Sequence, residues 1–493
     1  KNTYEKRGHL MLNSIQHFTE NGIPQLEEIM KKFMQNPADL NQFVDQVKQV
    51  MLEFGCHIVS ETLEECNTML EESVKRKISW QIKDRAERTL LTSLGQLRFS
   101  RTRFTHKKSG KTAYLLDQML GLSAHTRLSA DAKASILKEA AQSSYQKAGE
   151  CLPESVSRET VMRAVHKLKI SKPEKPVVEE KRKVKTLYVE ADEDHIALQF
   201  HEKKGDVKRW NGHGDNQQIV KLVYVHEGIE TNGKRNQLKH PFYFGGVRPG
   251  KENEELWKEV YDYIQKTYDM ETLEEIRFQS DGGGWMKKGQ QMLGGTFVLD
   301  EFHLRKYVKR ICRLTEKEDA EKELLTWIRE NQKRKVEEWI QEKYARLTER
   351  KQNKLQKAWS YLKRNWKGIQ ERLKETEENI GSSTESHVSH MLSVRMSSRP
   401  MGWSLKGADH VAQLRIYLKN GRDLSELLLP LKTEGTEGAE KEDEKRCFSA
   451  HEILAWEKQK QKKNGKYIEA LQATVSRQTG AKFYFQSAIA GIC

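Results

Sequence analysis

The sequence predicts an α/β fold in which a mixed β-sheet carries acidic residues where its strands end. Two short apolar runs, residues 276–279 and 296–299, are each followed by an aspartate, and a short helical run separates them. A third apolar run, residues 186–191, also leads into acidic residues. Ligands of open α/β sheets lie at the carboxyl ends of the strands, so acids delivered there are candidate metal ligands.

The charge of the chain favours a polyanionic partner. Its 493 residues include 86 Lys and Arg against 71 Asp and Glu, which gives a formal net charge of +15. No apolar run approaches the length of a membrane span, so nucleic acid is favoured over a membrane. The six cysteines are scattered and form no C-x-x-C pair, which is typical of a reducing compartment. We therefore expect a cytoplasmic protein.

The N-terminal part of the chain is predicted to be mainly helical and to contain a DNA-binding motif. Apolar residues recur at three- and four-residue spacing through residues 43–58. A basic β-hairpin follows at 89–128. At 129–170 the pattern indicates two helices, with Ser157 as the N-cap of the second, which is the layout of a helix-turn-helix. An ordinary helical hairpin is the alternative.

The second helix of this motif would present three side chains to a DNA major groove, namely Arg158, Thr160 and Arg163. The segment after it contains two prolines within a dense run of charges. Such a composition cannot bury a core, so residues 171–185 are expected to form a linker.

The order of elements after the linker predicts the topology of the sheet. The expected elements are strands at 186–191, 196–200 and 219–225, a helix at 253–268, a strand at 276–279, a helix at 285–293 and a strand at 296–299. This is the order of the ribonuclease H-like fold, in which the first strand is central and the fourth lies beside it. That adjacency would bring Asp192 and Asp281 together.

A basic helical insertion then interrupts the predicted sheet domain. Residues 304–380 keep helical spacing and hold 22 Lys and Arg against 14 Asp and Glu. We expect this insertion to lie along a DNA backbone, with Lys354 and Lys357 among the contacts. After it, Glu385 lies in the first turn of a helix. The helix dipole alone favours a glutamate there, but a helix returning to the sheet could also supply a third metal carboxylate.

Four phrases of the sequence together resemble DDE-type transposases of bacterial insertion sequences, in particular those of the ISLre type, which are related to Mutator-like transposases. The phrases are YVEADEDH, FQSDGGGW, LDEFHLRKYV and TESHVSHMLSVRMSSRPMGWS. The resemblance implies that Asp192, Asp281 and Glu385 hold Mg²⁺, for which Mn²⁺ should be able to substitute. It also implies that Asp300 and His303 support the site, either by ordering it or by contacting DNA near the cleaved bond.

The chemistry of such a site suits the residue types. Two Mg²⁺ ions held by carboxylates can stabilise both the attacking and the leaving oxygen of a phosphodiester. Asp194 lies on the same strand face as Asp192 and is the alternative ligand. Arg395 and Arg399 follow Glu385 in a basic segment and are also expected to contact DNA.

The partners implied by the resemblance are double-stranded DNA, as element ends and as target, and further copies of the same chain when two ends are brought together. The protein would then be associated with the nucleoid. Two other functions stay open: a ribonuclease H-like nuclease that only hydrolyses, and a DNA-binding regulator derived from an inactive transposase.

The predicted division of the chain has nine parts. These are a helical N-terminal region at 1–88, the β-hairpin region at 89–128, the helix-turn-helix region at 129–170, the linker at 171–185, the first part of the catalytic core at 186–303, the basic helical insertion at 304–380, the second part of the core with Glu385 at 381–430, a charged linker at 431–447 and a C-terminal helical region at 448–493.

Overall fold

The computed structural model describes residues 10–428, except 171–179, 201, 204, 207–215, 234, 317–319, 375 and 377–378. The predicted charged linker 431–447 and C-terminal helical region 448–493 therefore lie outside the described residues, as does most of the linker 171–185. The chain divides into two compact units at the boundary between Ala132 and Lys133. In the described ranges no helix combines the length and the apolar character that crossing a membrane requires.

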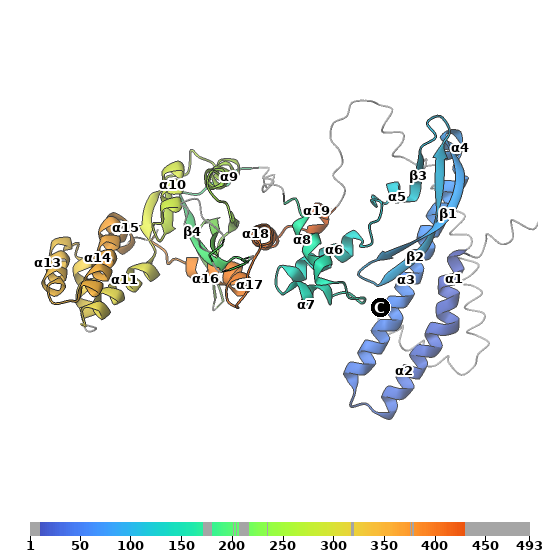
Figure 1. The fold of residues 1–493 in the computed structure, drawn as a ribbon, viewed down its shortest axis with the longest axis horizontal. Helices are drawn as coiled ribbons and strands as arrows, with labels where there is room; N and C mark the ends of the chain where they lie inside the picture. Colours follow the sequence, from blue (N-terminus) through green and yellow to red (C-terminus); the bar gives the residue numbers. More distant parts are fainter. Residues whose placement is uncertain are drawn as a thin grey trace, which may run out of the picture. The chain divides into compact units, whose positions relative to one another are not determined.

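The N-terminal unit combines long helices with a three-stranded antiparallel sheet (Figure 1). Its elements are α1 (Leu10–His17), the π-helix η2 (Phe18–Gly22), α2 (Ile23–Gln35), α3 (Leu40–Glu72), α4 (Val74–Ser79), β1 (Trp80–Leu91), β2 (Gln96–His106), β3 (Thr112–Tyr114) and α5 (Leu115–Met119). Leu70 of α3 is fully buried and packs with Leu97, Phe99 and Phe104 of β2. This contact fixes α3 against one face of the sheet.

The predicted boundary between the helical region and the hairpin is wrong. The helices end at Ser79, and β1 begins at Trp80 rather than near residue 89. The first half of β1 is largely charged or polar and exposed, so it lacks the apolar alternation that marks a half-buried strand. Its partner β2 supplies the buried side chains instead.

Three helices open the second unit: α6 (Ala130–Ala140), which begins just before the boundary, α7 (Tyr145–Gly149) and α8 (Arg158–His166). The predicted N-cap is confirmed, because the Ser157 side chain accepts a hydrogen bond from the backbone N–H of Thr160. The buried side chains of α8 are Val161 and Val165. These anchor α8 while its other face stays open.

A five-stranded mixed sheet forms the centre of the second unit, as predicted. Its strands are β4 (Thr186–Ala197), β5 (Gln217–His226), β8 (Phe242–Gly246), β9 (Glu275–Ser280) and β10 (Thr296–Leu299), in the spatial order β10-β9-β4-β5-β8. The first strand is central, and it pairs in parallel with β9 and antiparallel with β5. A small separate hairpin consists of β6 (Ile229–Asn232) and β7 (Arg235–Leu238).

One predicted strand of this sheet is wrong. Residues 196–200 do not form a second strand, because β4 continues through the acidic residues to Ala197. Asp192 and Asp194 are rungs of the ladder with β5, opposite Leu222 and Val220. The third antiparallel strand is β8, which contains two glycines and follows a short hairpin.

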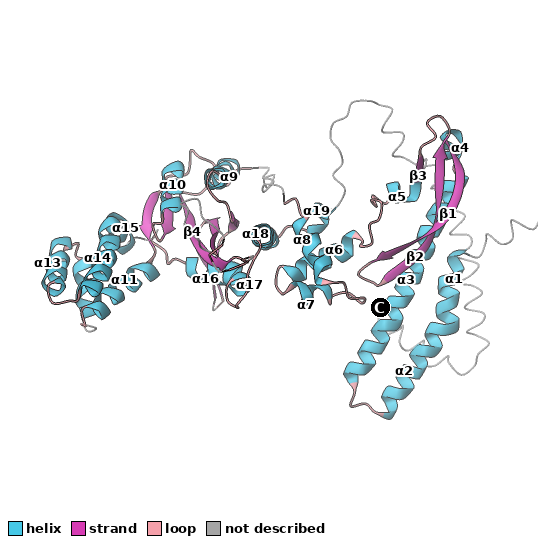
Figure 2. Ribbon diagram, viewed as in Figure 1, coloured by secondary structure: helices cyan, strands magenta, loops and turns pink. Residues whose placement is uncertain are grey.

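Helices cover both faces of the sheet. On one face, α9 (Glu252–Thr267) and α10 (Gly284–Leu293) bury an apolar core around Trp257 against alternate residues of β4, such as Leu187 and Val189. Figure 2 shows the strands of this sheet in magenta, with α9, α10 and α16 around β4. A Cβ at Gly289 of α10 would overlap the Trp257 ring, so only glycine allows this close packing.

The chain returns to the other face of β4 after the insertion. This last segment comprises α16 (Thr384–Val388), the π-helix η3 (Ser389–Ser393), α17 (Val394–Met396), α18 (Leu405–Lys419) and α19 (Leu424–Leu428). It faces the alternate residues of β4, which include Glu190 and Asp192.

The insertion is helical, as predicted, and has its own core. Its helices are α11 (Glu301–Leu314), α12 (Ala320–Arg329), α13 (Lys333–Tyr344), α14 (Glu349–Arg364) and α15 (Trp366–Leu373). Trp359 and Trp366 are buried in this core. Gly368 of α15 lies against Phe297 of β10, which joins the insertion to the edge of the sheet.

Candidate active site

Three aspartates follow the same rung of the parallel ladder. Ser280 of β9 pairs with Ala191 of β4 on one side and with Leu299 of β10 on the other. Each of these three residues is followed in the sequence by an aspartate, namely Asp192, Asp281 and Asp300. The register therefore delivers three carboxylates to one edge of the sheet, as we expected from the element order.

Glu385 belongs to the same electrostatic site. Burial of Asp192, which is 8% exposed, together with the negative charges of Asp281, Glu385 and Asp300, raises the pKa of its carboxyl to about 8. A hydrogen bond from the backbone N–H of Glu193 opposes this shift. The charge of Glu385 thus affects Asp192, although the helical insertion separates the two residues in the sequence.

The four acids differ in how fully they are hydrogen bonded. Asp300 accepts at both oxygens, from the backbone N–H of Phe302 (2.6 Å) and from Ser382 Oγ (3.3 Å). Asp192 Oδ1 accepts from Glu193 N (2.8 Å), and Asp281 Oδ1 accepts from Gly283 N (2.7 Å). The exposed side chain of Glu385 has no hydrogen bond or ion pair within the part of the chain that the structure describes. Asp300 is therefore held in place, and Glu385 is free to turn.

The donor set fits a divalent cation. Carboxylate oxygens are the ligands that Mg²⁺ prefers, and a bound cation would remove the repulsion that raises the pKa of Asp192. With the side chains as they stand, no three His, Cys, Asp or Glu residues of the described ranges are grouped tightly enough to hold an ion. Binding would require the carboxylates to move closer together, so the metal site stays a prediction.

A tyrosine from the insertion completes the surroundings of the acids. The Tyr361 hydroxyl of α14 donates a hydrogen bond to the backbone carbonyl of Asp281 (2.6 Å), and its ring stacks on Tyr307 at 3.8 Å. Burial raises the pKa of Tyr361, and the charges of Asp281, Asp300 and Asp192 add to the shift. Sequence reasoning missed this residue, because helical spacing marks it only as part of an amphipathic helix.

A fully buried carboxylate holds the loop before Glu385, and sequence reasoning missed it as well. Glu190 lies on the same face of β4 as Asp192 and has no exposed surface. Burial opposes its ionisation, yet hydrogen bonds from His226, Thr384 and Ser382 lower its pKa to about 2. Its oxygens accept from Thr384 Oγ1 (2.6 Å), Ser382 Oγ (2.9 Å), Ser383 N (3.0 Å) and His226 Nε2 (3.1 Å). The only sequence signal was an acid between apolar residues of a strand.

Asp194 and His303 occupy distinct positions. Asp194 Oδ2 accepts a hydrogen bond from Ser397 Oγ (2.8 Å), at the end of α17. This gives Asp194 a structural partner of its own. His303 is half-buried, and its Nδ1 has no hydrogen-bond partner in the described ranges. Its ring packs edge-on against Phe302, with centroids 5.3 Å apart.

The residues predicted to contact DNA are mostly exposed. In α8, Arg158 and Arg163 are exposed, while Thr160 is half-buried. Arg158 pairs with its neighbour Glu159 at 2.8 Å. Lys354, Lys357 and Arg399 are exposed as well. The exposure of these side chains does not test DNA binding, which stays a prediction.

Arg395 is the exception. It is 7% exposed, its Nε donates to the backbone carbonyl of Ala140 (3.2 Å), and its guanidinium lies 4.8 Å from the Trp403 ring. Burial lowers its pKa. Because this side chain is used in packing, its position does not agree with the predicted DNA contact.

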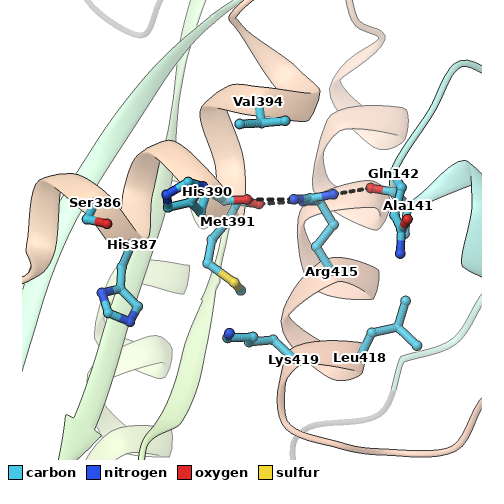
Figure 3. Close-up of a pocket in the computed structure, with 10 residues that line it drawn as sticks. All are labelled: Ala141, Gln142, Ser386, His387, His390, Met391, Val394, Arg415, Leu418 and Lys419. Atoms are coloured by element: carbon cyan, nitrogen blue, oxygen red, sulfur yellow. Dashed lines mark hydrogen bonds between the residues drawn. The ribbon is translucent and has the colours of Figure 1, made fainter. Parts of the chain in front are cut away.

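A pocket of about 670 Å³ is lined by residues of α16, η3 and α18, among others (Figure 3). Arg415 spans it and donates hydrogen bonds to the backbone carbonyls of His390, Met391 and Ala141. Two of these carbonyls belong to the π-helix η3, whose irregular backbone leaves them available. Arg415 therefore fixes the path of the chain just after Glu385.

Comparison with known proteins identifies a family without an assigned function. The model described as "Uncharacterised protein family (UPF0236)" matches residues 33–430. A UPF0236 protein of Caldanaerobacter subterraneus subsp. tengcongensis, whose name joins four locus names, is 32% identical over 424 residues, which are 85% of each chain. Another from the same organism, whose name joins eleven locus names, is 32% identical over 425 residues, again 85% of each chain. The UPF0236 protein in the vanSb 3′ region of Streptococcus gallolyticus is 28% identical over 406 residues, 77% of this chain and 84% of the relative.

Proposed function

The chain belongs to the uncharacterised protein family UPF0236, and we propose that it is a DDE-type transposase of a bacterial insertion sequence with a ribonuclease H-like catalytic core. The observation that carries the proposal is that the strand register places Asp192 and Asp281 at neighbouring strand ends, where burial and the charges of Asp281 and Glu385 raise the pKa of Asp192. An acid perturbed in this way is typical of a functional site. A stable fold gains nothing from placing them together.

The occurrence of relatives at many loci of one genome supports the same proposal. Single UPF0236 sequences of Caldanaerobacter subterraneus carry four and eleven locus names. Repeated copies of one gene are typical of an element that moves or copies itself. They are not expected of a single-copy regulator or housekeeping nuclease.

In the proposed reaction the acids would hold divalent cations, which would supply positive charge at the scissile phosphate. Such cations would stabilise the charge on the attacking and leaving oxygens of an in-line displacement. Asp192 lies in β4 and Asp281 directly follows β9, while Glu385 would approach them from α16. Asp300 holds the start of α11, and His303 offers an unpartnered ring nitrogen beside it.

The basic surfaces of the chain would hold the DNA during this reaction. The exposed arginines of α8 suit base and phosphate contacts in a major groove. The excess of lysine and arginine in the insertion suits sequence-independent contacts to phosphates. Helix α8 would therefore supply sequence recognition, and the insertion would supply affinity that does not depend on sequence.

A cleavage and joining assay tests the proposal. The full chain is incubated with Mg²⁺ and a plasmid that carries the reading frame with its flanking DNA. We expect breaks at the two ends of the element, and joining of a pre-cleaved end with a free 3′ hydroxyl to a second plasmid. Asp192→Asn, Asp281→Asn and Glu385→Gln keep size but remove charge, so each should abolish both products while DNA binding persists.

The controls separate the competing functions. Asp194→Asn, which removes a carboxylate bonded to Ser397, should retain most activity. Cleavage without joining would favour a nuclease that only hydrolyses. Sequence-specific binding without any metal-dependent product would favour a regulator and would overturn the proposal.

A further inference from the structure

A cationic groove with an aromatic wall runs between two helices of the insertion. Its volume is about 660 Å³, and residues of α11 and α14 line it. Six of the nine lining residues are Lys or Arg, and none is acidic. We call it the α11–α14 groove, and the side chains that matter for its chemistry are Phe302, Lys306, Tyr307, Arg310, Arg313 and Lys354.

Most of the positive charge in this groove is uncompensated. Within the described ranges, Lys306, Arg310, Arg313 and Lys354 form no ion pair with an acid. Two cations of the lining pair with acids in the described part of the chain, Arg305 with Glu301 at 2.9 Å and Lys309 with Glu321 at 4.0 Å. Like charges gathered along one groove repel each other, so the arrangement favours a polyanionic occupant.

Phe302 gives the groove a second property that phosphate binding does not require. Its side chain is 47% exposed, although an exposed phenyl ring contributes little to the stability of a helix. The backbone beneath it is fixed, because the N–H of Phe302 donates to Asp300 Oδ1. Lys306 Nζ lies over the ring, 5.4 Å from its centre, and the His303 ring lies nearly perpendicular to the Phe302 ring. The ring is thus a partly exposed flat surface beside the cations of the groove.

A flat aromatic surface beside cations matches an unpaired nucleotide better than a duplex. In a duplex the faces of the bases are covered by their neighbours, so the protein meets mainly phosphates and groove edges. An unpaired base exposes its face and stacks on aromatic side chains whatever its sequence. An acidic peptide would satisfy the cations but has no planar group for Phe302.

The groove adjoins the acid cluster. Tyr307 in its wall stacks on Tyr361, whose hydroxyl bonds to the backbone of Asp281. Phe302 follows Asp300 by two residues. A strand that leaves the acids along α11 would therefore enter the groove directly.

We propose that the α11–α14 groove binds an unpaired segment of a nucleic acid strand, with a base stacked on Phe302 and phosphates against Lys306, Arg310, Arg313 and Lys354. In a transposase this segment would be opened DNA next to the cleaved bond. That role rests on the proposed function, whereas the binding of unpaired strand does not.

Metal-free binding of defined oligonucleotides tests the inference. The full chain is titrated in EDTA against a fluorescent oligothymidine of about 12 nucleotides and against a duplex of the same length. Phe302→Ala should weaken single-strand binding about 5- to 150-fold, the effect of losing one stacked base, and leave duplex binding unchanged. Phe302→Trp should preserve or tighten single-strand binding. Phe302→Leu, which stays apolar but has no aromatic face, should behave like the alanine variant.

A matched control uses another exposed aromatic residue on a helix. Tyr261 of α9 is 37% exposed and does not line the groove, so Tyr261→Ala should leave both affinities unchanged. Melting curves of all variants establish that each one folds. Lys306→Gln and Arg310→Gln should each reduce the salt dependence of single-strand binding by about 0.7 of a log unit per log unit of salt.

Three results would overturn the inference. The first is single-strand affinity that does not change in Phe302→Ala. The second is an equal loss for single strand and duplex. The third is competition by polyglutamate as strong as by an oligonucleotide of the same charge, which would indicate an anion site without base stacking. Absence of Mg²⁺-dependent cleavage by the unchanged protein, with Phe302-dependent strand binding intact, would instead contradict the proposed function alone.

Discussion

At the scale of single residues, Glu190 is the side chain on which the geometry of the candidate site most depends. It is completely buried although its pKa is about 2, and it accepts five hydrogen bonds from His226 and the loop 382–384. Since Glu385 follows this loop directly, the carboxylate of Glu190 sets where the helix of Glu385 begins.

Replacing Glu190 by Gln should destabilise the protein strongly. The change keeps the size but leaves buried donors without their charged acceptor, a loss of about 3–5 kcal/mol in comparable cases. Urea unfolding at pH 7 measures it. Glu254→Gln, at an exposed ion pair with Lys288, is the matched control and should change stability little. Equal stabilities of the two variants would contradict the role assigned to Glu190.

The ionised Glu190 also predicts how the stability of the protein depends on pH in the acid range. Its folded-state pKa of about 2 lies below the unfolded value of 4.5, so its contribution to stability is complete above pH 4.5 and is lost as the pH falls towards 2. Acid unfolding of the unchanged protein should therefore be steeper over this range than that of Glu190→Gln. Parallel profiles would show that Glu190 is not ionised in the folded state.

Asp192 predicts the opposite dependence of stability on pH when no metal is bound. Its folded-state pKa of about 8 lies above 3.8, so its favourable contribution exists below pH 3.8 and is lost as the pH rises to about 8. Asp192→Asn is neutral at every pH. In EDTA at pH 8.5 it should melt at a higher temperature than the unchanged protein, by about 2–4 °C for each kcal/mol of repulsion relieved. Scanning calorimetry tests this, and equal melting temperatures would argue against the convergence of the acids.

At the scale of helices and strands, the sequence predicted the order of elements better than their limits. Alternation and apolar runs located β9, β10 and the helix α10 between them, because these elements pack against the apolar core of the sheet. β1 is mostly exposed and β8 is short and rich in glycine, so neither carries the pattern of a buried strand. The extent of β4 was wrong because its acidic half is held by pairing with β5 rather than by apolar burial.

The candidate site, too, could be predicted only in part from the sequence. Aspartates at the ends of apolar runs could be recognised, and their adjacency followed from the predicted order of strands. Glu190 and Tyr361 could not, because their roles depend on segments that return from far along the chain. Arg395 could not be distinguished from an exposed arginine, because Trp403 and Ala140 cover it only in the folded chain.

The position of α8 predicts that its arginines affect the preference for one DNA sequence more than the general affinity for DNA. Its exposed Arg158 and Arg163 lie on the helix assigned to the major groove, so replacing both by Ala should reduce the preference for element ends over unrelated DNA. We expect a loss of about 1–3 kcal/mol for each base contact removed, with little change in binding to unrelated DNA. Competition binding with the two DNAs measures the ratio. A uniform loss on both would assign α8 to phosphate contacts instead.

At the scale of the whole molecule, the distribution of charge divides the work of DNA binding. The chain carries a formal net charge of +15, and the insertion alone holds 22 Lys and Arg against 14 Asp and Glu. Base contacts from α8 can specify a sequence, but phosphate contacts supply most of the affinity and release counterions from DNA. Affinity should therefore depend on salt mainly through the insertion.

Replacing Lys354 and Lys357 by Ala should lower affinity for element ends and for unrelated DNA to the same extent. In metal-free titrations the logarithm of the binding constant should fall linearly with that of salt concentration, with a slope of about −0.9 for each phosphate neutralised. The double variant should make this slope shallower by about 2, since each lysine is assigned one phosphate. Lys288→Ala, on α10 outside the insertion, should leave the slope unchanged. If the slope of the double variant equals that of the unchanged protein, the exposed lysines of α14 do not contact DNA, and the charge of the insertion serves another purpose.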